Sequence, residues 1–544
     1  MHRTLLFLLL LITLPTMVLA QGLHSVDLAA ALERVPFTQW LNAYQQSAMT
    51  VTDFNVASVE DFIEITEFHH AFVNDGEIIH SFRTSRGDRI HCIDIATQAS
   101  FVAQSRGEAS PHIAPVAAAL TSRNRSVPTA ERFGLDGTPD TDGKLRACPA
   151  GSFPKLIPPV NNFYRFRTLD DIFQKVPAAS NKEYTHEYTH AYQYANYTGE
   201  IADFNVWAPF VESSNEFSLA QLWVANGDGS NLQTVETGWQ VYQGLYGNDT
   251  ANLFIFYTPD GYQSGCYNLT CGAFVQTDNS VVIGGPFDQV STINGEQVNV
   301  TIGFIRDESG DHDWWLVLDD TWVGYYPNDL FDNEGIAEYG AFVDFGGELI
   351  DRHPNGDHTA TSMGSGLFPD AGYGYAAYIK KAQYINLDGE YRDADEMATQ
   401  ATVPECWDIG PLNNDADVDW GVNFFFGGSC GECNGCLIDN QCYLNGQPNP
   451  DNACQICDLA QSEFTWTQIP DGESCNDGLF CNGSDTCDEG DCSLHTGNPC
   501  DEDLRCDEQL NQCVDPDDSD DLIDPDQAQQ SRDDEDDEGS GCGC

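Results

Sequence analysis

Two histidines lie four positions apart in the segment His186-Glu187-Tyr188-Thr189-His190. In zinc peptidases this His-Glu-x-x-His pattern lies on a helix, where both imidazoles bind the metal and the glutamate is the general base. Here the residues from Ala191 to Tyr197 alternate aromatic with other side chains, and tyrosine and threonine favour strands. We therefore expect a strand, and a zinc peptidase that uses His186 and His190 stays as an alternative.

A longer set of motifs follows in one order along the chain. Its main members are Glu236-Thr237-Gly238-Trp239, Gly265-Cys266-Tyr267-Asn268-Leu269-Thr270-Cys271, Trp314-Trp315-Leu316, Phe345-Gly346-Gly347-Glu348 and Met363-Gly364-Ser365-Gly366. This series resembles the neprosin family of glutamic peptidases, and the resemblance covers roughly residues 52–430. Around Ile90-His91-Cys92-Ile93-Asp94-Ile95 the N-terminal part is similar to the activation peptide of that family.

The resemblance implies an antiparallel β-sandwich whose cleft holds two catalytic glutamates, which correspond to Glu236 and Glu348. Peptide hydrolysis by carboxyl groups needs one ionised group that takes a proton from water and one protonated group that polarises the carbonyl. Two carboxyls in one cleft repel each other when both are charged, so they share one proton and work best in acid. We expect no metal and no cofactor, and the roles of base and acid stay open.

Further residues are candidates for the site around the pair. Gln221 is a candidate side-chain amide donor to the oxyanion. Members of the family characteristically cleave after proline, so an aromatic pocket for the proline ring is expected, with Trp239, Tyr262 and Trp315 as candidates. The expected partners are therefore protein or peptide substrates that contain proline.

The cysteines and the N-terminus predict export. The chain has 20 cysteines, and 12 of them lie between Cys433 and Cys513, which is typical of a disulfide framework. Residues 1–20, with an apolar run from Leu5 to Ile12, are typical of a signal peptide. We therefore expect a secreted protein. The family resemblance implies two bridges in the peptidase domain, Cys266 with Cys271 and Cys406 with Cys430.

The texture of the sequence predicts several parts. Between about residues 181 and 430, short runs rich in aromatic and β-branched residues recur between glycine- and asparagine-rich turns, which indicates an all-β sandwich. Helical patterns occur only near the N-terminus, so an α+β propeptide is expected there. The predicted parts are a signal peptide at 1–20, an activation propeptide and linker at 21–180, a peptidase domain at 181–430, a Cys-rich disulfide module at 431–513 and a disordered acidic tail at 514–544.

The formal net charge is −63, from 86 acidic and 23 basic residues. Such a field repels nucleic acid and anionic membranes, so both are poor candidate partners and no nucleic-acid partner is expected. The Cys-rich module is similar to disulfide-rich repeats of bacterial surface proteins. Attachment to a cell surface through Cys542 or Cys544 is a hypothesis for the C-terminal region.

Together these features predict a secreted, acid-active endopeptidase that cleaves after proline and is made as a zymogen. A non-catalytic surface adhesin is an alternative of a different class, because a peptidase-like sandwich and a Cys-rich module can also serve binding. Sensitivity to chelators separates the zinc alternative from both.

Overall fold

The structure is a computed structural model in which the chain divides into two compact units. The N-terminal unit spans residues 1–432 with 439–441, and the C-terminal unit spans 433–438 with 442–544. The residues described are 36–46, 54–100, 128–175, 184–331, 334–353, 358–414, 419–430, 435–438, 441–444, 446, 448–449, 452–462, 464–475, 479, 481–500, 504–507 and 512–514. The expected signal peptide, and the expected acidic tail beyond Val514, lie outside them.

The N-terminal region, residues 36–175, combines helices with a small sheet. Its elements are α2 (Phe37–Gln46), α3 (Val59–Val73), the antiparallel strands β1 (Ile78–Arg83), β2 (Arg89–Asp94) and β3 (Ser152–Ile157), α5 (Val160–Phe163) and α6 (Leu169–Phe173). The hydroxyl of Ser58 accepts from the Asp61 N–H and begins α3. A capping box formed by Thr168 and Asp171 begins α6, which leads directly to Lys175.

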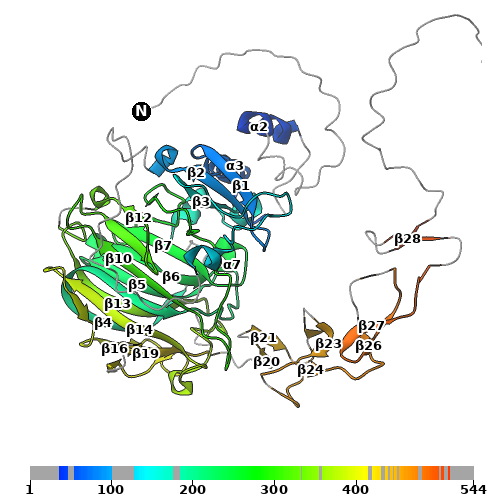
Figure 1. Cartoon of the computed structure of the whole chain (residues 1–544). Helices are drawn as coiled ribbons and strands as arrows, with labels where there is room; N and C mark the ends of the chain where they lie inside the picture. Colours follow the sequence, from blue (N-terminus) through cyan, green and yellow to red (C-terminus); the bar gives the residue numbers. More distant parts are fainter. Residues whose placement is uncertain are drawn as a thin grey trace, which may run out of the picture. The chain divides into compact units, whose positions relative to one another are not determined.

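A network of 16 antiparallel strands forms the rest of the N-terminal unit (Figure 1). The strands are β4 (Thr185–Asn205), β5 (Ser218–Asn226), β6 (Gln233–Val241), β7 (Asn252–Thr258), β8 (Cys266–Tyr267), β9 (Val275–Gln276), β10 (Asn299–Arg306), β11 (Trp314–Leu318), β12 (Thr321–Tyr326), β13 (Gly340–Asp351), β14 (Ala377–Asn386), β15 (Tyr391–Asp393), β16 (Ala398–Ala401), β17 (Asp408–Ile409), β18 (Asn413–Asn414) and β19 (Val422–Gly427). A short helix, α7 (Gln243–Tyr246), follows β6, and five 3₁₀ turns lie at Ile95–Thr97, Thr129–Phe133, Gly229–Asn231, Asn328–Leu330 and Pro369–Ala371.

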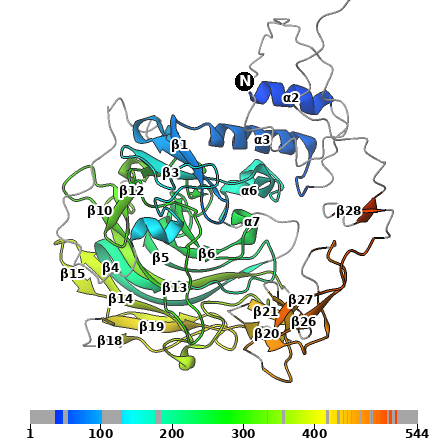
Figure 2. The same ribbon diagram turned by 45° about the vertical axis from the view of Figure 1, so that its right-hand side comes forward.

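The long strand β4 links two layers of this network, whose curl is visible in Figure 2. Over residues 185–197 it pairs with β13, and over residues 199–205 it pairs with β10. One layer therefore runs β8-β7-β6-β5-β13-β4 and the other β4-β10-β11-β12-β9. Side chains from both layers share one buried core, among them Trp239 and Phe345 from the first and Phe204 and Leu316 from the second. The predicted antiparallel β-sandwich is confirmed.

Short strands and disulfides make up the C-terminal unit. The strands are β20 (Gly435–Ile438), β21 (Gln441–Leu444), β22 (Pro448–Asn449), β23 (Asn452–Ile456), β24 (Thr467–Gln468), β25 (Ser474–Cys475), β26 (Asp485–Asp488), β27 (Asp491–His495), β28 (Arg505–Asp507) and β29 (Gln512–Val514). The bridges described here are Cys436–Cys457, Cys454–Cys487, Cys475–Cys492, Cys481–Cys506 and Cys500–Cys513. Its apolar cluster is small, so these bridges supply the constraint that a larger core would otherwise give.

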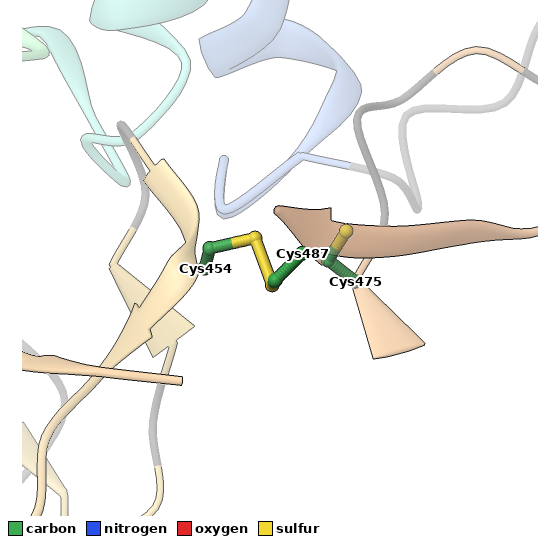
Figure 3. A group of neighbouring side chains, drawn as sticks. All are labelled: Cys454, Cys475 and Cys487. Atoms are coloured by element: carbon green, nitrogen blue, oxygen red, sulfur yellow. A yellow bond between two sulfur atoms is a disulfide. The ribbon is translucent and has the colours of Figure 1, made fainter. Parts of the chain in front are cut away.

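Three cysteines of this unit, Cys454, Cys475 and Cys487, bring their sulfurs within 4.8 Å of one another (Figure 3). Metal binding by cysteine needs free thiolates. Cys454 and Cys487 are bonded to each other, and Cys475 is bonded to Cys492. The group is therefore part of the disulfide framework. Within the described ranges, no helix is long and apolar enough to cross a membrane.

Glu200 provides a test of how this sandwich responds to pH. Its side chain on β4 is fully buried, and burial, with the charge of Asp344 adding to it, raises the pKa of Glu200 well above its usual range. A carboxyl whose pKa is higher in the folded protein than in the unfolded chain favours folding below the unfolded pKa, near 4. That contribution is lost as the pH rises through the folded pKa.

Glu200→Gln, which is neutral at every pH, should therefore raise Tm by roughly a few degrees at about pH 7 and leave it nearly unchanged at about pH 3. Calorimetry at the two pH values measures this difference, with the exposed Glu338→Gln as the matched control. An equal effect of Glu200→Gln at both pH values would contradict the account.

Candidate active site

Glu236 and Glu348 lie on strands β6 and β13, which are separated in the sheet only by β5. Because side chains alternate along a strand, register decides which residues share a face. Gln221 of β5 is paired with Gly238 on β6 and with Gly346 on β13, each two residues from one of the glutamates. The two glutamates and Gln221 therefore project from the same face of the sheet.

The two glycines beside Gln221 are required by close packing of the backbone. A Cβ at position 238 would lie 1.9 Å from the carbonyl oxygen of Ala220, and one at position 346 would lie 2.3 Å from that of Thr189. No side chain therefore covers Gln221 from either neighbouring strand. The glycines of the Glu-Thr-Gly and Gly-Gly-Glu motifs thus leave room between the two carboxyl groups.

A single cation joins the two carboxyl groups in this structure. Lys175 Nζ lies 2.7 Å from Glu236 Oε2 and 3.1 Å from Glu348 Oε2. Both glutamates are fully buried, and Lys175 is 8% exposed. The N-terminal region therefore places a positive charge between two acids that lie 112 positions apart in the sequence.

Glu348 has a hydrogen-bond donor at each oxygen. His186 Nδ1 lies 2.5 Å from Oε1, and the Gln221 amide Nε2 donates to Oε2 at 2.8 Å. Burial opposes ionisation, but the charge of Lys175 and the hydrogen bond from His186 outweigh it and lower the pKa of Glu348 to about 2. In this arrangement Glu348 is a carboxylate even in acid.

Apart from Lys175, the hydrogen-bond partners of Glu236 are hydroxyl groups. Thr234 Oγ1 and the Tyr262 hydroxyl donate to its Oε1 at 2.8 and 2.7 Å. Burial and the charge of Glu236 raise the pKa of Tyr262 well above its usual range, so the phenol keeps its proton. Tyr262 has φ +62°, in the left-handed region that non-glycine residues seldom adopt, and this strained turn directs the hydroxyl to the carboxylate.

The structure places only one of the three candidate pocket aromatics at the pair. Tyr262 contacts Glu236, as described. Trp239 lies three positions after Glu236, an odd offset that places it on the opposite face of β6. There it is fully buried, and its Nε1 donates to the carbonyl of Asn205 at 3.0 Å. Trp315 is also fully buried, against Tyr325 of the neighbouring strand β12. The expectation that Trp239 and Trp315 line the pocket is therefore corrected.

The His-Glu-x-x-His segment lies within β4, as its alternation predicted. His186 approaches Glu348, whereas His190 Nδ1 lies 2.9 Å from both carboxylate oxygens of Asp344. The helical face that zinc peptidases use is not formed. Within the described part of the chain, the group of Cys454, Cys475 and Cys487 is the only one whose three or more potential ligand atoms lie close enough to share a metal.

Both disulfides implied for the peptidase domain are present, Cys266–Cys271 and Cys406–Cys430. A further bridge, Cys92–Cys148, links β2 to the segment before β3 in the N-terminal region. Sequence analysis missed Lys175, Thr234 and the contact of His186 with Glu348. Thr234 could have been found, because it lies two residues before Glu236 and so shares its face.

Removal of the buried cation should be costly only while the two acids are present. Lys175→Met leaves two carboxylates facing each other, and loss of one partner of a buried ion pair costs about 3 kcal/mol or more. We expect a lower free energy of unfolding at about pH 7. In the Glu236→Gln, Glu348→Gln double variant the same change should be neutral or stabilising, because the lysine then lacks counter-charges. Denaturant unfolding of the four chains measures both effects, and an equal loss in both backgrounds would contradict the ion-pair account.

Part of the chain matches a known protein family. Residues 214–429 match the family model described as Neprosin. Similar solved structures include scytalido-glutamic peptidase with a peptide-based transition-state analogue and SCP-B, a member of the eqolisin family of peptidases, in complex with the tripeptide Ala-Ile-His. Each has 11% identity and a TM-score of 0.24, and each match covers 45% of this chain and 100% of the other. The region that matches the Neprosin family model, residues 214–429, includes Gln221, Glu236 and Glu348.

Proposed function

We propose that this protein is a secreted, acid-active glutamic endopeptidase that is made as an inactive precursor and cleaves after proline. The observation that carries the proposal is the meeting of two buried carboxyl groups, Glu236 and Glu348, within reach of one lysine on a glycine-flanked face of the sheet. The Neprosin domain match supports a peptidase. Cleavage after proline rests on the family resemblance.

The partners of the two acids assign their roles once Lys175 leaves. Glu348 keeps a donor at each oxygen, from His186 and Gln221, which favours its ionised form. Glu236 keeps partners at Oε1 only, and its Oε2, vacated by Lys175, is the place for the shared proton. Glu348 is therefore the base of the pair and Glu236 the acid.

Hydrolysis then proceeds without a covalent intermediate. Glu348 takes a proton from water as the water oxygen bonds to the scissile carbonyl carbon, and Glu236 gives its proton to the carbonyl oxygen. The second hydrogen of the Gln221 amide is available to the same oxygen. Glu348 next protonates the leaving nitrogen while Glu236 recovers a proton from the tetrahedral hydroxyl, and the C–N bond breaks. Both acids return to their starting states.

Tyr262 and two other rings are candidates for contact with the proline ring of the substrate. Trp223 is paired with Glu236 across β5 and β6, and Tyr188 is paired with Glu348 across β4 and β13. Both share the face of the glutamates, and the rings of Tyr188 and Trp223 lie 6.2 Å apart. Proline stacks well on such apolar ring faces. These residues replace Trp239 and Trp315 in the proposed pocket.

The inactive state follows from the position of Lys175, which occupies the place where water and the carbonyl would bind. Acid acts on the N-terminal region through two buried histidines, His69 on α3 and His91 on β2. Burial is the main cause that lowers the pKa of each to about 4, helped at His91 by Arg89 and Lys155.

The direction of the pH dependence that these two histidines give to stability favours release of the N-terminal region in acid. A histidine whose folded pKa lies below its unfolded value of about 6.5 leaves the fold fully stable above that value. Stability is then lost as the pH falls towards 4. The N-terminal region, which carries Lys175, therefore loosens as the solution becomes acid.

Export is proposed from the disulfides. The described residues contain eight bridges, which form and persist in oxidising compartments. Attachment to a cell surface through the C-terminal cysteines remains a proposal, because Cys542 and Cys544 lie outside the described residues.

The catalytic pair is tested with proline-containing peptides at about pH 3 and pH 7, with products identified by mass. Glu236→Gln and Glu348→Gln should each reduce kcat/KM at least about a thousandfold, because each removes a proton-transfer group, and a chelator should have no effect. Cleavage that survives both substitutions and is lost with chelator would move the chemistry to a metal site. Absence of cleavage by the fully processed wild type would favour a binding protein.

His69→Gln tests the acid release separately. His69 Nε2 lies 2.9 Å from the carbonyl oxygen of Pro158, and a glutamine amide can donate to that oxygen without becoming charged. We expect the variant to shift the midpoint pH of self-processing downwards, followed by gel electrophoresis over a pH series. The half-buried His80→Gln is the control, since its Nε2 also contacts a backbone carbonyl. Equal midpoints for His69→Gln and the wild type would contradict the histidine mechanism.

A further inference from the structure

His186 lies between the buried carboxylate of Glu348 and solvent. Its Nδ1 lies 2.5 Å from Glu348 Oε1, and its side chain is 28% exposed while that of Glu348 is fully buried. Along β4 it is paired with Ile350, two residues from Glu348, so the imidazole reaches along the strand to the carboxylate.

The rings around His186 hold the imidazole in place. Its ring lies almost parallel to that of Tyr188 at 6.0 Å and meets the edges of Tyr184 and Phe217 at 5.7 and 6.5 Å. Phe217 belongs to the apolar cluster that also contains Ile350. A ring packed on three sides has little rotational freedom, so its hydrogen bond to Glu348 is pre-organised.

The two glutamates differ in the kind of group that contacts them. Thr234 and Tyr262 at Glu236 are hydroxyls, which can donate to a carboxylate or turn to accept from a carboxylic acid. In acid a histidine is a cation with a proton on each nitrogen, and it can only donate. A proton on Oε1 of Glu348 would meet this donor, so His186 opposes protonation of Glu348 and the hydroxyls leave Glu236 free to be protonated.

The other groups that face Glu348 cannot take over this task. Lys175 belongs to the N-terminal region and must leave, and Gln221 is uncharged. Asp344 and Glu236 bear like charge, which favours protonation of Glu348, and His190 is paired with Asp344. The titratable or charged groups around Glu348 are Lys175 after α6, His186, Tyr188 and His190 on β4, Glu236 on β6, Tyr262 after β7 and Asp344 on β13.

We propose that His186 is a positioning residue that keeps Glu348 ionised and oriented as the base after Lys175 has left. The inference rests on the proposed peptidase function and adds a residue outside the matched domain, which begins at residue 214. It gives the His-Glu-x-x-His segment a role in carboxylate chemistry. His186 thereby sets how far into acid the enzyme stays active.

The experiment compares wild type, His186→Phe, His186→Asn and His190→Asn. Each protein is produced as the full chain and then processed in acid before the assay. The measurement is kcat and KM for an uncharged proline-containing peptide across about pH 2 to 7. For His186→Phe, which keeps a stacking ring but no donor, we expect kcat to fall about tenfold at the optimum with KM little changed. In the plot of kcat against pH, the midpoint of the acid limb, where activity falls on acidification, should move up by about one pH unit. The reason is that Glu348 then takes up its proton at a higher pH.

His186→Asn keeps a donor near the place of Nδ1 but no charge, so it should retain kcat within a few fold and still move the acid limb upwards. His190→Asn changes the neighbouring His–Asp pair and should leave the limb in place. The proposal is overturned if both His186 variants keep the wild-type limb, or if His190→Asn moves it as far as they do. If His186→Phe does not fold, as judged by its melting curve, the comparison of the two asparagine variants decides.

Glu236→Gln and Glu348→Gln in the same assay separate this proposal from the proposed function. If these variants remain active, the glutamic mechanism itself is wrong whatever His186 does. If they are inactive and the His186 variants behave as the wild type, the pair is catalytic and only the role of His186 is wrong.

Discussion

The structure depends on the contact of one lysine with two carboxylates. Lys175 lies between Glu236 and Glu348, and all three side chains are buried or nearly so. Two adjacent buried carboxylates would repel each other at neutral pH, and a buried lysine without partners would be equally costly. The positive charge of Lys175 lies between the two negative charges, so each buried charge has a partner of opposite sign. The same contact that makes the buried acids tolerable also fills the proposed substrate site, so in the proposed precursor one contact would account for both stability and inactivity.

The sheet makes such an arrangement possible because its register is rigid. Alternation along β5, β6 and β13 directs Gln221 and the two glutamates to one face, while the opposite face of the same strands, with Trp239 and Phe345, forms the core. The glycines at 238 and 346 keep the surface of the sheet between the two glutamates free of side chains from β6 and β13. Asymmetry then arises from neighbours, since Glu348 has an imidazole and an amide, and Glu236 has two hydroxyls.

Local sequence patterns predicted several of these features. The period-two texture identified β4 and so argued correctly against a helical zinc motif, and recurring short strands indicated the sandwich. The resemblance named two glutamates that the structure brings together. Trp239 was expected in the proline pocket, but alternation along β6 places it on the opposite face from Glu236. Gln221 and His186 reach Glu348 only through strand pairing, and nothing local to Lys175 distinguishes it from other lysines. Contacts of this kind depend on which strands pair and in which register. The periodicity of the sequence does not determine that pairing.

Chemical labelling of the carboxylates tests the central claim most directly, namely that Glu236 and Glu348 form the active pair and that Lys175 closes it. A small epoxide that alkylates ionised carboxylates can be added to the precursor and to the acid-processed protein, and the label located by mass spectrometry. The account predicts that one label per processed chain, on Glu348 or Glu236, abolishes peptidase activity, and that the precursor stays unlabelled at both positions. Inactivation with the label elsewhere, or equal labelling of the pair in both forms, would contradict it.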